Sequence, residues 1–282
     1  MNQTTRLVLH GGAGAAASDD GRSSAHLSGL GGRCQAMLES GVAALDVVEY
    51  AVAEMEASGL YVAGRGSRPN RDGDFEMDAS IMDGATRRAG AVAGARSVFS
   101  PVGVARRVMQ DTLHVLLAGA GADRFAHDLG LRTIGSPAEY FVALPAADEG
   151  GSPHGTVGAV ALDRSGALAA ATSTGGAMGK LAGRIGDSAL IGAGTWADDA
   201  VAVSCTGVGE YFIRVAAAHE VAARVRLAHV PLGQAVDEVL AMIAADGGAG
   251  GIIAVSARGE AVARWNTPAM KHYIAEMANG CM

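Results

Sequence analysis

The sequence lacks three features that mark whole classes of proteins. Its 282 residues contain no run of like charges and carry a net charge of −7, so no basic surface for nucleic acid or an anionic membrane is predicted. The three cysteines, Cys34, Cys205 and Cys281, are too widely spaced for a disulfide framework or a zinc site. No uncharged run provides the roughly 18 apolar residues of a membrane helix. We therefore expect a cytoplasmic protein with no nucleic-acid or membrane partner.

Proline and charged residues are also scarce, whereas glycine is abundant. Proline occurs 7 times and charged residues make up 18% of the chain, against 41 glycines, about twice the average glycine share of about 7%. The apolar content of 49% excludes intrinsic disorder. Glycine without a triplet period excludes collagen. The composition predicts a compact interior in which backbone segments approach closely.

Apolar periodicity predicts both helices and strands along the chain. Helices are expected at 34–56, 101–117, 210–226 and 232–245, and strands at 6–10, 76–82, 89–95, 189–193, 201–205, 251–256 and 260–265. Three prolines and an acidic, glycine-rich cluster predict an exposed linker over about 131–155. The runs 156–162 and 167–173 flank a turn tetrapeptide and predict a hairpin.

Thr156 begins this hairpin directly after the linker, and pairing about the turn places it across from Ser173 or Thr174. Its hydroxyl could attack the carbonyl of Gly155, because glycine has no side chain to obstruct an N-to-O acyl shift. Cleavage would leave Thr156 with a nucleophilic hydroxyl and a free α-amine, whose pKa of about 8 suits a general base. On spacing alone, a threonine that merely opens a strand is the more ordinary interpretation.

Two segments carry further candidate groups. Thr206, Gly207 and Gly209 lie between a predicted strand and a helix start, where unpaired N–H groups can receive an oxyanion or a carboxylate. Arg184 and Asp187 offer opposite charges three residues apart, which suits the two ends of an α-amino acid. A tight glycine turn and a surface ion pair are the structural alternatives. The glycine loops lack a complete dinucleotide fingerprint and the lysine of a P-loop.

Five motifs occur together and in one order, after an opening His-Gly-Gly-Ala-Gly at 10–14: they are 76–84, 155–158, 173–176, 183–187 and 205–207. In this combination the chain resembles the plant-type asparaginase and isoaspartyl peptidase family of N-terminal nucleophile (Ntn) hydrolases. The resemblance implies an α+β fold, a four-layer αββα sandwich. It also implies a precursor that cuts itself between Gly155 and Thr156, into an α-subunit 1–155 and a β-subunit 156–282 that together form one structural domain.

The resemblance further implies a role for each matching residue. Thr156 would be the nucleophile and Thr174 its hydroxyl partner, and Thr206 and Gly207 would form the oxyanion hole. Arg184 would bind the substrate α-carboxylate. Asp187, together with Gly207 and Gly209, would make the remaining substrate contacts. No cofactor is implied for the chemistry. A structural sodium ion is implied on backbone carbonyls of Met55, Glu56, Ser58, Tyr61, Ala63 and Arg65. The implied assembly is a homodimer of processed αβ units.

The implied activity is hydrolysis of β-aspartyl amide bonds, in isoaspartyl dipeptides and L-asparagine, through an acyl-enzyme on Thr156. One alternative is a relative specific for glycosylasparagine or another amide. Another is an uncut, non-catalytic protein that binds amino acids, although such a protein has no use for the hydroxyls of Thr156, Thr174 and Thr206. The chain departs from the family at Val62, where members usually have asparagine before Ala63 and Gly64.

Overall fold

The computed structural model describes residues 4–14, 21–142 and 155–275. Its helices are α1 (Arg22–Glu39), α2 (Ala44–Ser58), α3 (Pro101–Asp111), α4 (Gly119–Asp128), α5 (Pro137–Tyr140), α6 (Gly209–Arg214), α7 (Ala217–Leu227) and α8 (Leu232–Ala245). Its strands are β1 (Arg6–Gly14), β2 (Met77–Asp83), β3 (Ala89–Ala95), β4 (Leu116–Ala118), β5 (Val157–Leu162), β6 (Leu168–Thr174), β7 (Thr195–Ala197), β8 (Val201–Gly207), β9 (Gly250–Ser256), β10 (Ala261–Trp265) and β11 (Ala269–Ile274). Short 3-10 turns span Gly64–Gly66 and Asp187–Ala189.

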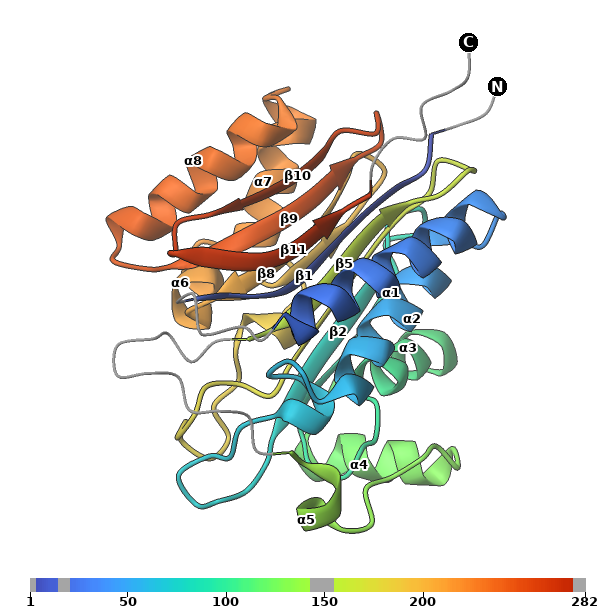
Figure 1. Ribbon diagram of the computed structural model, residues 1–282, viewed down its shortest axis with the longest axis vertical. Coiled ribbons are helices and arrows are strands. Elements are labelled where there is room, and N and C mark those ends of the chain that lie inside the picture. The colour runs from blue at the N-terminus through green and yellow to red at the C-terminus, as the bar shows by residue number, and fades with distance from the viewer. Residues whose placement is uncertain (1–3, 15–20, 143–154, 276–282) are drawn as a thin grey trace.

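The strands form two sheets that pack face to face between layers of helices (Figure 1). The larger sheet has the order β11-β1-β5-β6-β2-β3-β4, and the smaller has the order β10-β9-β8-β7. Helices α1, α2 and α3 cover the outer face of the larger sheet, while α7 and α8 cover the smaller one. The predicted αββα sandwich is therefore confirmed. No helix in the described part of the chain is long and apolar enough to cross a membrane.

Three apolar clusters fill the spaces between these four layers. One joins the large sheet to its helices, one joins the small sheet to α7 and α8, and the third lies between the sheets. The central strand β5 is covered on both faces, and all six of its residues are apolar and buried. Cys34 and Cys205 are buried free thiols in the first two clusters.

The predicted hairpin is formed by β5 and β6. Asp163 closes its turn, since one carboxylate oxygen accepts hydrogen bonds from the backbone amides of Ser165 and Ala167. Val157 pairs with Ser173 at the open end of the hairpin. Thr156 is the next residue outward, so the register places it opposite Thr174, as the sequence predicts.

Two predicted helices are each divided in the structure. The segment 34–56 belongs to α1 and α2, which are separated at Gly41, whose φ of 97° ends the first helix. The segment 210–226 belongs to α6 and α7, which are separated at Ala216, a non-glycine residue with φ of 49°. The spacing of apolar residues does not reveal these breaks, because both helices of each pair carry buried residues.

Two other predicted elements differ as well. The helix expected over 101–117 ends at Asp111, since the Thr112 hydroxyl donates to the Val108 carbonyl and accepts from the His114 amide. The strand expected at 189–193 is wrong: a turn at Gly192 (φ 94°) precedes the actual strand, β7. The first part of the expected linker contains α5, and 143–154 lie outside the described residues.

Small residues let α3 lie very close to β3. A Cβ added at Gly90 would lie 2.0 Å from the Ala105 carbonyl oxygen and 2.7 Å from the Met109 amide nitrogen. These are backbone atoms of a packed helix, so they cannot move aside without shifting α3. Gly121 in α4, by contrast, has nothing within 4 Å of such a Cβ.

We expect Gly90→Ala to destabilise the protein by about 1 to 3 kcal/mol, the usual cost of overpacking. This corresponds to a fall in Tm of about 3 to 10 °C, measured by scanning calorimetry. Gly121→Ala is the matched control and should leave Tm unchanged or raise it slightly, because alanine is the better helix former. Equal effects of the two substitutions would contradict the close approach of α3 to β3.

Candidate functional site

The two hydroxyls predicted to face each other do meet at the open end of the β5–β6 hairpin. Thr156 Oγ1 donates to Thr174 Oγ1 over 3.1 Å, and both residues are buried. Thr174 Oγ1 also accepts from the Gly176 amide and lies 3.5 Å from the Val62 carbonyl oxygen. Thr174 therefore fixes the rotamer of Thr156 and leaves lone pairs of the Thr156 oxygen available for attack.

Val62 lies directly against the predicted cleavage position. A Cβ at Gly155 would lie 2.7 Å from Val62 Cγ2, so a side chain at this position would require Val62 to shift. The Val62 carbonyl accepts a hydrogen bond of 2.8 Å from the Gly175 amide. The residue that differs from the family pattern thus contacts both Gly155 and the segment that follows Thr174.

Thr206 and Gly207 end strand β8 on the side of the small sheet that faces the large one. Thr206 alternates with Ser204 along the strand, so both side chains point toward the large sheet. The Thr206 hydroxyl is buried and has no hydrogen-bond partner among the described residues. At Gly207 (φ 152°) a Cβ would lie 2.4 Å from the Ala249 carbonyl oxygen. An unsatisfied buried donor beside a side-chain-free backbone suits a ligand oxygen.

Arg184, Asp187 and Gly209 converge on one point. A Cβ at Gly209 would lie 2.8 Å from Asp187 Oδ1 and 3.2 Å from Arg184 Nη2. Arg184 donates from Nε and Nη2 to the two carboxylate oxygens of Glu210, each over 2.9 Å. The ion pair of Arg184 is therefore with Glu210 and not with Asp187. Its Nη1 atom has no hydrogen-bond partner among the described residues and remains available to a ligand carboxylate.

Asp187 is a buried carboxyl group without full compensation. It is 3% exposed, and its Oδ2 atom has no partner among the described residues. Burial raises the pKa of Asp187 to about 7, although the nearby Arg184 charge acts in the opposite direction. A cationic ligand group at this position would supply the missing partner.

A second buried carboxylate supports the loop that carries Arg184. Asp78 accepts hydrogen bonds from the Gly94 and Gly186 amides, and Lys180 donates to the Glu76 carbonyl over 2.7 Å. Burial raises the pKa of Asp78 and lowers that of Lys180. Sequence reasoning assigned no role to Asp78, Lys180 or Glu210. The signals were an acid between the apolar residues Met77 and Ala79 of a predicted strand, and an acid directly after Gly209.

The residues whose carbonyls are expected to bind sodium lie in the last turn of α2 (Met55, Glu56 and Ser58) and in the segment that follows it (Tyr61, Ala63 and Arg65). This segment folds back on α2, since a Cβ at Gly64 (φ 52°) would lie 2.4 Å from the Glu56 carbonyl oxygen. Four carbonyls of the expected set already accept one hydrogen bond each, namely those of Met55, Tyr61, Ala63 and Arg65. A carbonyl oxygen has two lone pairs, so the set retains acceptors for a hard cation.

Within residues 4–14, 21–142 and 155–275, no group of three or more His, Cys, Asp or Glu side chains could hold a metal ion.

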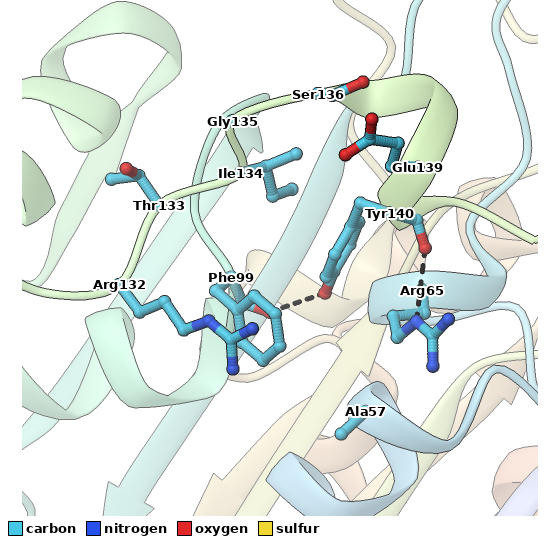
Figure 2. Close-up of a pocket in the computed structure, with 10 residues that line it drawn as sticks. All are labelled: Ala57, Arg65, Phe99, Arg132, Thr133, Ile134, Gly135, Ser136, Glu139 and Tyr140. Atoms are coloured by element: carbon cyan, nitrogen blue, oxygen red, sulfur yellow. Dashed lines mark hydrogen bonds between the residues drawn. The ribbon is translucent and has the colours of Figure 1, made fainter.

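Two surface hollows are lined by residues close in sequence to the candidate site residues. One, of about 440 Å³, is bordered by Gly183 and Ile185 on either side of Arg184. The other, of about 390 Å³, lies beside α5, where the Tyr140 hydroxyl donates to the Phe99 carbonyl (Figure 2). Neither hollow is lined by Thr156.

Comparison with known proteins agrees with the motif pattern. A family model described as Asparaginase matches residues 3–143 and 136–280. The isoaspartyl peptidase of Salmonella typhimurium strain LT2 is 44% identical over 96% of this chain and 94% of its own length. The chain belongs to the asparaginase family. Within this family, the isoaspartyl peptidase of Escherichia coli K12 is 43% identical over 94% of the chain and 90% of its own length. A plant-type L-asparaginase of Pyrobaculum calidifontis is also 43% identical, over 94% of the chain and 95% of its own length.

The raised pKa of Asp187 predicts a stability effect that depends on pH. The folded protein retains the proton up to about pH 7, whereas the unfolded chain loses it near pH 4. Stability is therefore lost as the pH rises through this window. At pH 8 we expect Asp187→Asn to raise the free energy of unfolding by at most about 4 kcal/mol, and therefore to raise Tm. At pH 4.5 the substitution should change Tm little. Melting curves of an exposed-site control, Asp199→Asn, should show no such difference; an Asp187→Asn effect independent of pH would contradict the assignment.

Proposed function

We propose that this member of the asparaginase family is a self-activating threonine amidohydrolase. It would release L-aspartate from β-aspartyl dipeptides and from L-asparagine. The observation that carries the proposal is the 3.1 Å contact between the hydroxyls of Thr156 and Thr174, directly after Gly155. Relatives named isoaspartyl peptidase or plant-type L-asparaginase, at 43 to 44% identity, support the substrate class.

Activation would begin with attack of Thr156 Oγ1 on the carbonyl carbon of Gly155. The peptide C–N bond breaks, an ester forms, and the Thr156 nitrogen leaves as an amine after taking up a proton. Water then hydrolyses the ester, which yields the Gly155 carboxylate and a new N-terminal Thr156. Gly155 has no side chain to obstruct the attack, and Val62 Cγ2 occupies the space that a Cβ there would need.

Turnover would use the same hydroxyl with the new α-amine as its base. The amine takes the proton from Oγ1 as the oxygen attacks the β-carbonyl carbon of the substrate. The Thr206 hydroxyl and the Gly207 amide would donate to the oxyanion, which matches the unsatisfied hydroxyl of Thr206. The amine returns the proton to the leaving nitrogen, and water hydrolyses the β-aspartyl ester on Thr156.

The charged groups select a substrate with an intact α-amino acid end. Arg184 would bind the α-carboxylate through its Nη1 side, while Glu210 holds the opposite edge of the guanidinium. Asp187 would bind the α-ammonium, beside Gly209, where no side chain fits. These contacts do not involve the leaving group, so glycosylasparagine and other β-aspartyl amides share them. A structural sodium ion on the six carbonyls is proposed with the enzyme, and a homodimer of processed units and a cytoplasmic location stay predictions.

The direct test of the proposal is Thr156→Ala on a denaturing gel and in an amidase assay. The wild type should give two bands from chains 1–155 and 156–282 and should hydrolyse β-aspartyl dipeptides. Thr156→Ala should remain one chain of 28.2 kDa without activity, because one hydroxyl performs both reactions. Thr156→Ser is the matched control and should still cut itself, more slowly, since it lacks the methyl group that restricts the rotamer. Self-cleavage in Thr156→Ala would place the nucleophile elsewhere.

Val62 predicts a difference between substrates. An apolar side chain cannot replace the hydrogen bonds of the family asparagine, and asparagine hydrolysis releases only ammonia, which offers few other contacts. Val62→Asn should raise kcat/KM for L-asparagine more than for a β-aspartyl dipeptide. The difference in transition-state stabilisation between the two substrates should be about 1 to 2 kcal/mol, the scale of one neutral hydrogen bond. Steady-state kinetics on both substrates measures the ratio. Equal changes, or loss of self-cleavage, would favour a pocket adapted to another amide.

A further inference from the structure

A line of polar side chains crosses the otherwise apolar space between the two sheets. It consists of Ser80, Thr195, Thr172, Ser204 and His10, each 0% exposed. Successive members come alternately from the large sheet and the small sheet, on β2, β7, β6, β8 and β1. The four successive contacts measure 2.7, 2.6, 2.7 and 3.0 Å. Neither the proposed cleavage nor the proposed hydrolysis uses any of these groups.

The last member of this line contacts the predicted nucleophile residue. His10 Nδ1 lies 3.1 Å from the carbonyl oxygen of Thr156. A carbonyl oxygen can only accept, so the proton of a neutral imidazole must be on Nδ1. Complete burial lowers the pKa of His10 to about 3, which keeps the ring neutral. Nε2 is then an acceptor.

This tautomer determines the direction of the neighbouring hydrogen bonds. Because Nε2 accepts, Ser204 must donate to it, and Ser204 in turn accepts from Thr172. Thr172 accepts from Thr195. The protons from Thr195 onward therefore all point toward the Thr156 carbonyl, an arrangement in which each bond polarises the next. Among the described residues, Nε2 has no hydrogen-bond acceptor other than the Ser204 hydroxyl, so no carbonyl or carboxylate there favours a proton on Nε2.

The backbone around Thr156 explains why a side chain holds this carbonyl. Strand β5 begins at Val157, so Thr156 lies one residue outside it. The pairing of β1 with β5 ends at His10 and Gly158, and β1 is irregular immediately after His10. Gly158 leaves the space that the imidazole fills, since a Cβ there would lie 2.3 Å from His10 Nε2 and 2.1 Å from Ser204 Oγ. Cleavage would then release Thr156 from Gly155 and leave it with fewer restraints.

We propose that His10 is a positioning residue for the nucleophile: its Nδ1–H holds the Thr156 carbonyl, and Ser204 holds the imidazole in the required tautomer. This inference rests on the proposed role of Thr156. The hydroxyl at the far end of the line, Ser80, lies 2.6 Å from the carbonyl oxygen of Ser188. The same line thus connects the nucleophile residue to the segment beside Asp187.

Two substitutions separate the contact with Thr156 from the contact with Ser204. His10→Asn places its amide nitrogen where Nδ1 lies and can still donate to the Thr156 carbonyl. His10→Gln places its amide near Nε2 and keeps only the Ser204 contact. We expect His10→Gln to lower kcat by about 10- to 100-fold, as for a misplaced reactive group, to leave KM within about threefold, and to slow self-cleavage. His10→Asn should recover most of kcat.

Thr195→Val controls for a purely structural role, because it removes a buried hydroxyl from the same line without touching His10. At a similar loss of Tm it should retain far more kcat than His10→Gln. Equal kcat losses in the Asn and Gln variants, or in the Gln and Thr195→Val variants, would overturn the proposal. A wild type that neither cuts itself nor hydrolyses β-aspartyl amides would instead refute the proposed function.

Nitrogen NMR of the wild-type protein tests the tautomer even if a variant fails to fold. The ring nitrogens of His10, assigned through the backbone of residue 10, should show a proton on Nδ1 only. They should not titrate between pH 5 and pH 8. A proton on Nε2, or protonation of the ring near pH 6.5, would overturn the proposed hydrogen bond to Thr156.

Discussion

The close contact of the two sheets at the strand ends that carry the site is the constraint on which the site depends. At this point the facing side chains are small: a Cβ at Gly158 of β5 would lie 2.1 Å from Ser204 Oγ of β8, and Thr172 of β6 lies 2.7 Å from the same atom. That approach brings β8, which carries Thr206 and Gly207, toward the hairpin that carries Thr156 and Thr174. Larger residues at these positions would separate the layers, because the interior is close-packed, and would lengthen the contacts between the hydroxyls.

Buried polar atoms without hydrogen-bond partners are a second feature of the candidate site. Asp187 and Thr206 each retain a polar atom without a partner among the described residues. Such groups reduce the stability of the folded chain, and an α-ammonium and an oxyanion would satisfy them in turn. Arg184 differs, because Glu210 neutralises one edge of its guanidinium before any ligand arrives. Of the two charged groups, Arg184 is thus already paired with Glu210, whereas Asp187 Oδ2 has no partner among the described residues.

Much of this arrangement follows from local sequence. The β5–β6 hairpin is encoded by two apolar runs around Asp163, and its register could be counted from the turn to Thr156 and Thr174. The division of helices at Gly41 and Ala216 could not be read in the same way, because one glycine is also compatible with a helix interior and alanine carries no turn signal. The strand predicted at 189–193 was misplaced, and β7 begins only at Thr195. The apolar spacing in this segment gives no indication of the turn at Gly192.

Contacts between distant segments were the least predictable. The pairing of Arg184 with Glu210, and of His10 with Ser204 and Thr156, joins positions 26, 194 and 146 residues apart. Each side chain has an ordinary local interpretation, as a surface charge, a strand histidine or a strand serine. Only the stacking of the two sheets gives these residues their partners, and no periodicity in one segment reports it.

The order of strands in the large sheet has a consequence for how the protein is assembled. Strand β1, from the first half of the chain, lies between β11 and β5, which both come from the second half. Strand β6 of the second half is likewise bonded to β2 of the first. The two halves are interleaved within the large sheet, so neither half can complete that sheet alone, whereas the small sheet comes entirely from the second half. After a break at residue 155 the products would be held together by the backbone hydrogen bonds of β1 with β5 and β11 and of β2 with β6, without any covalent link between them.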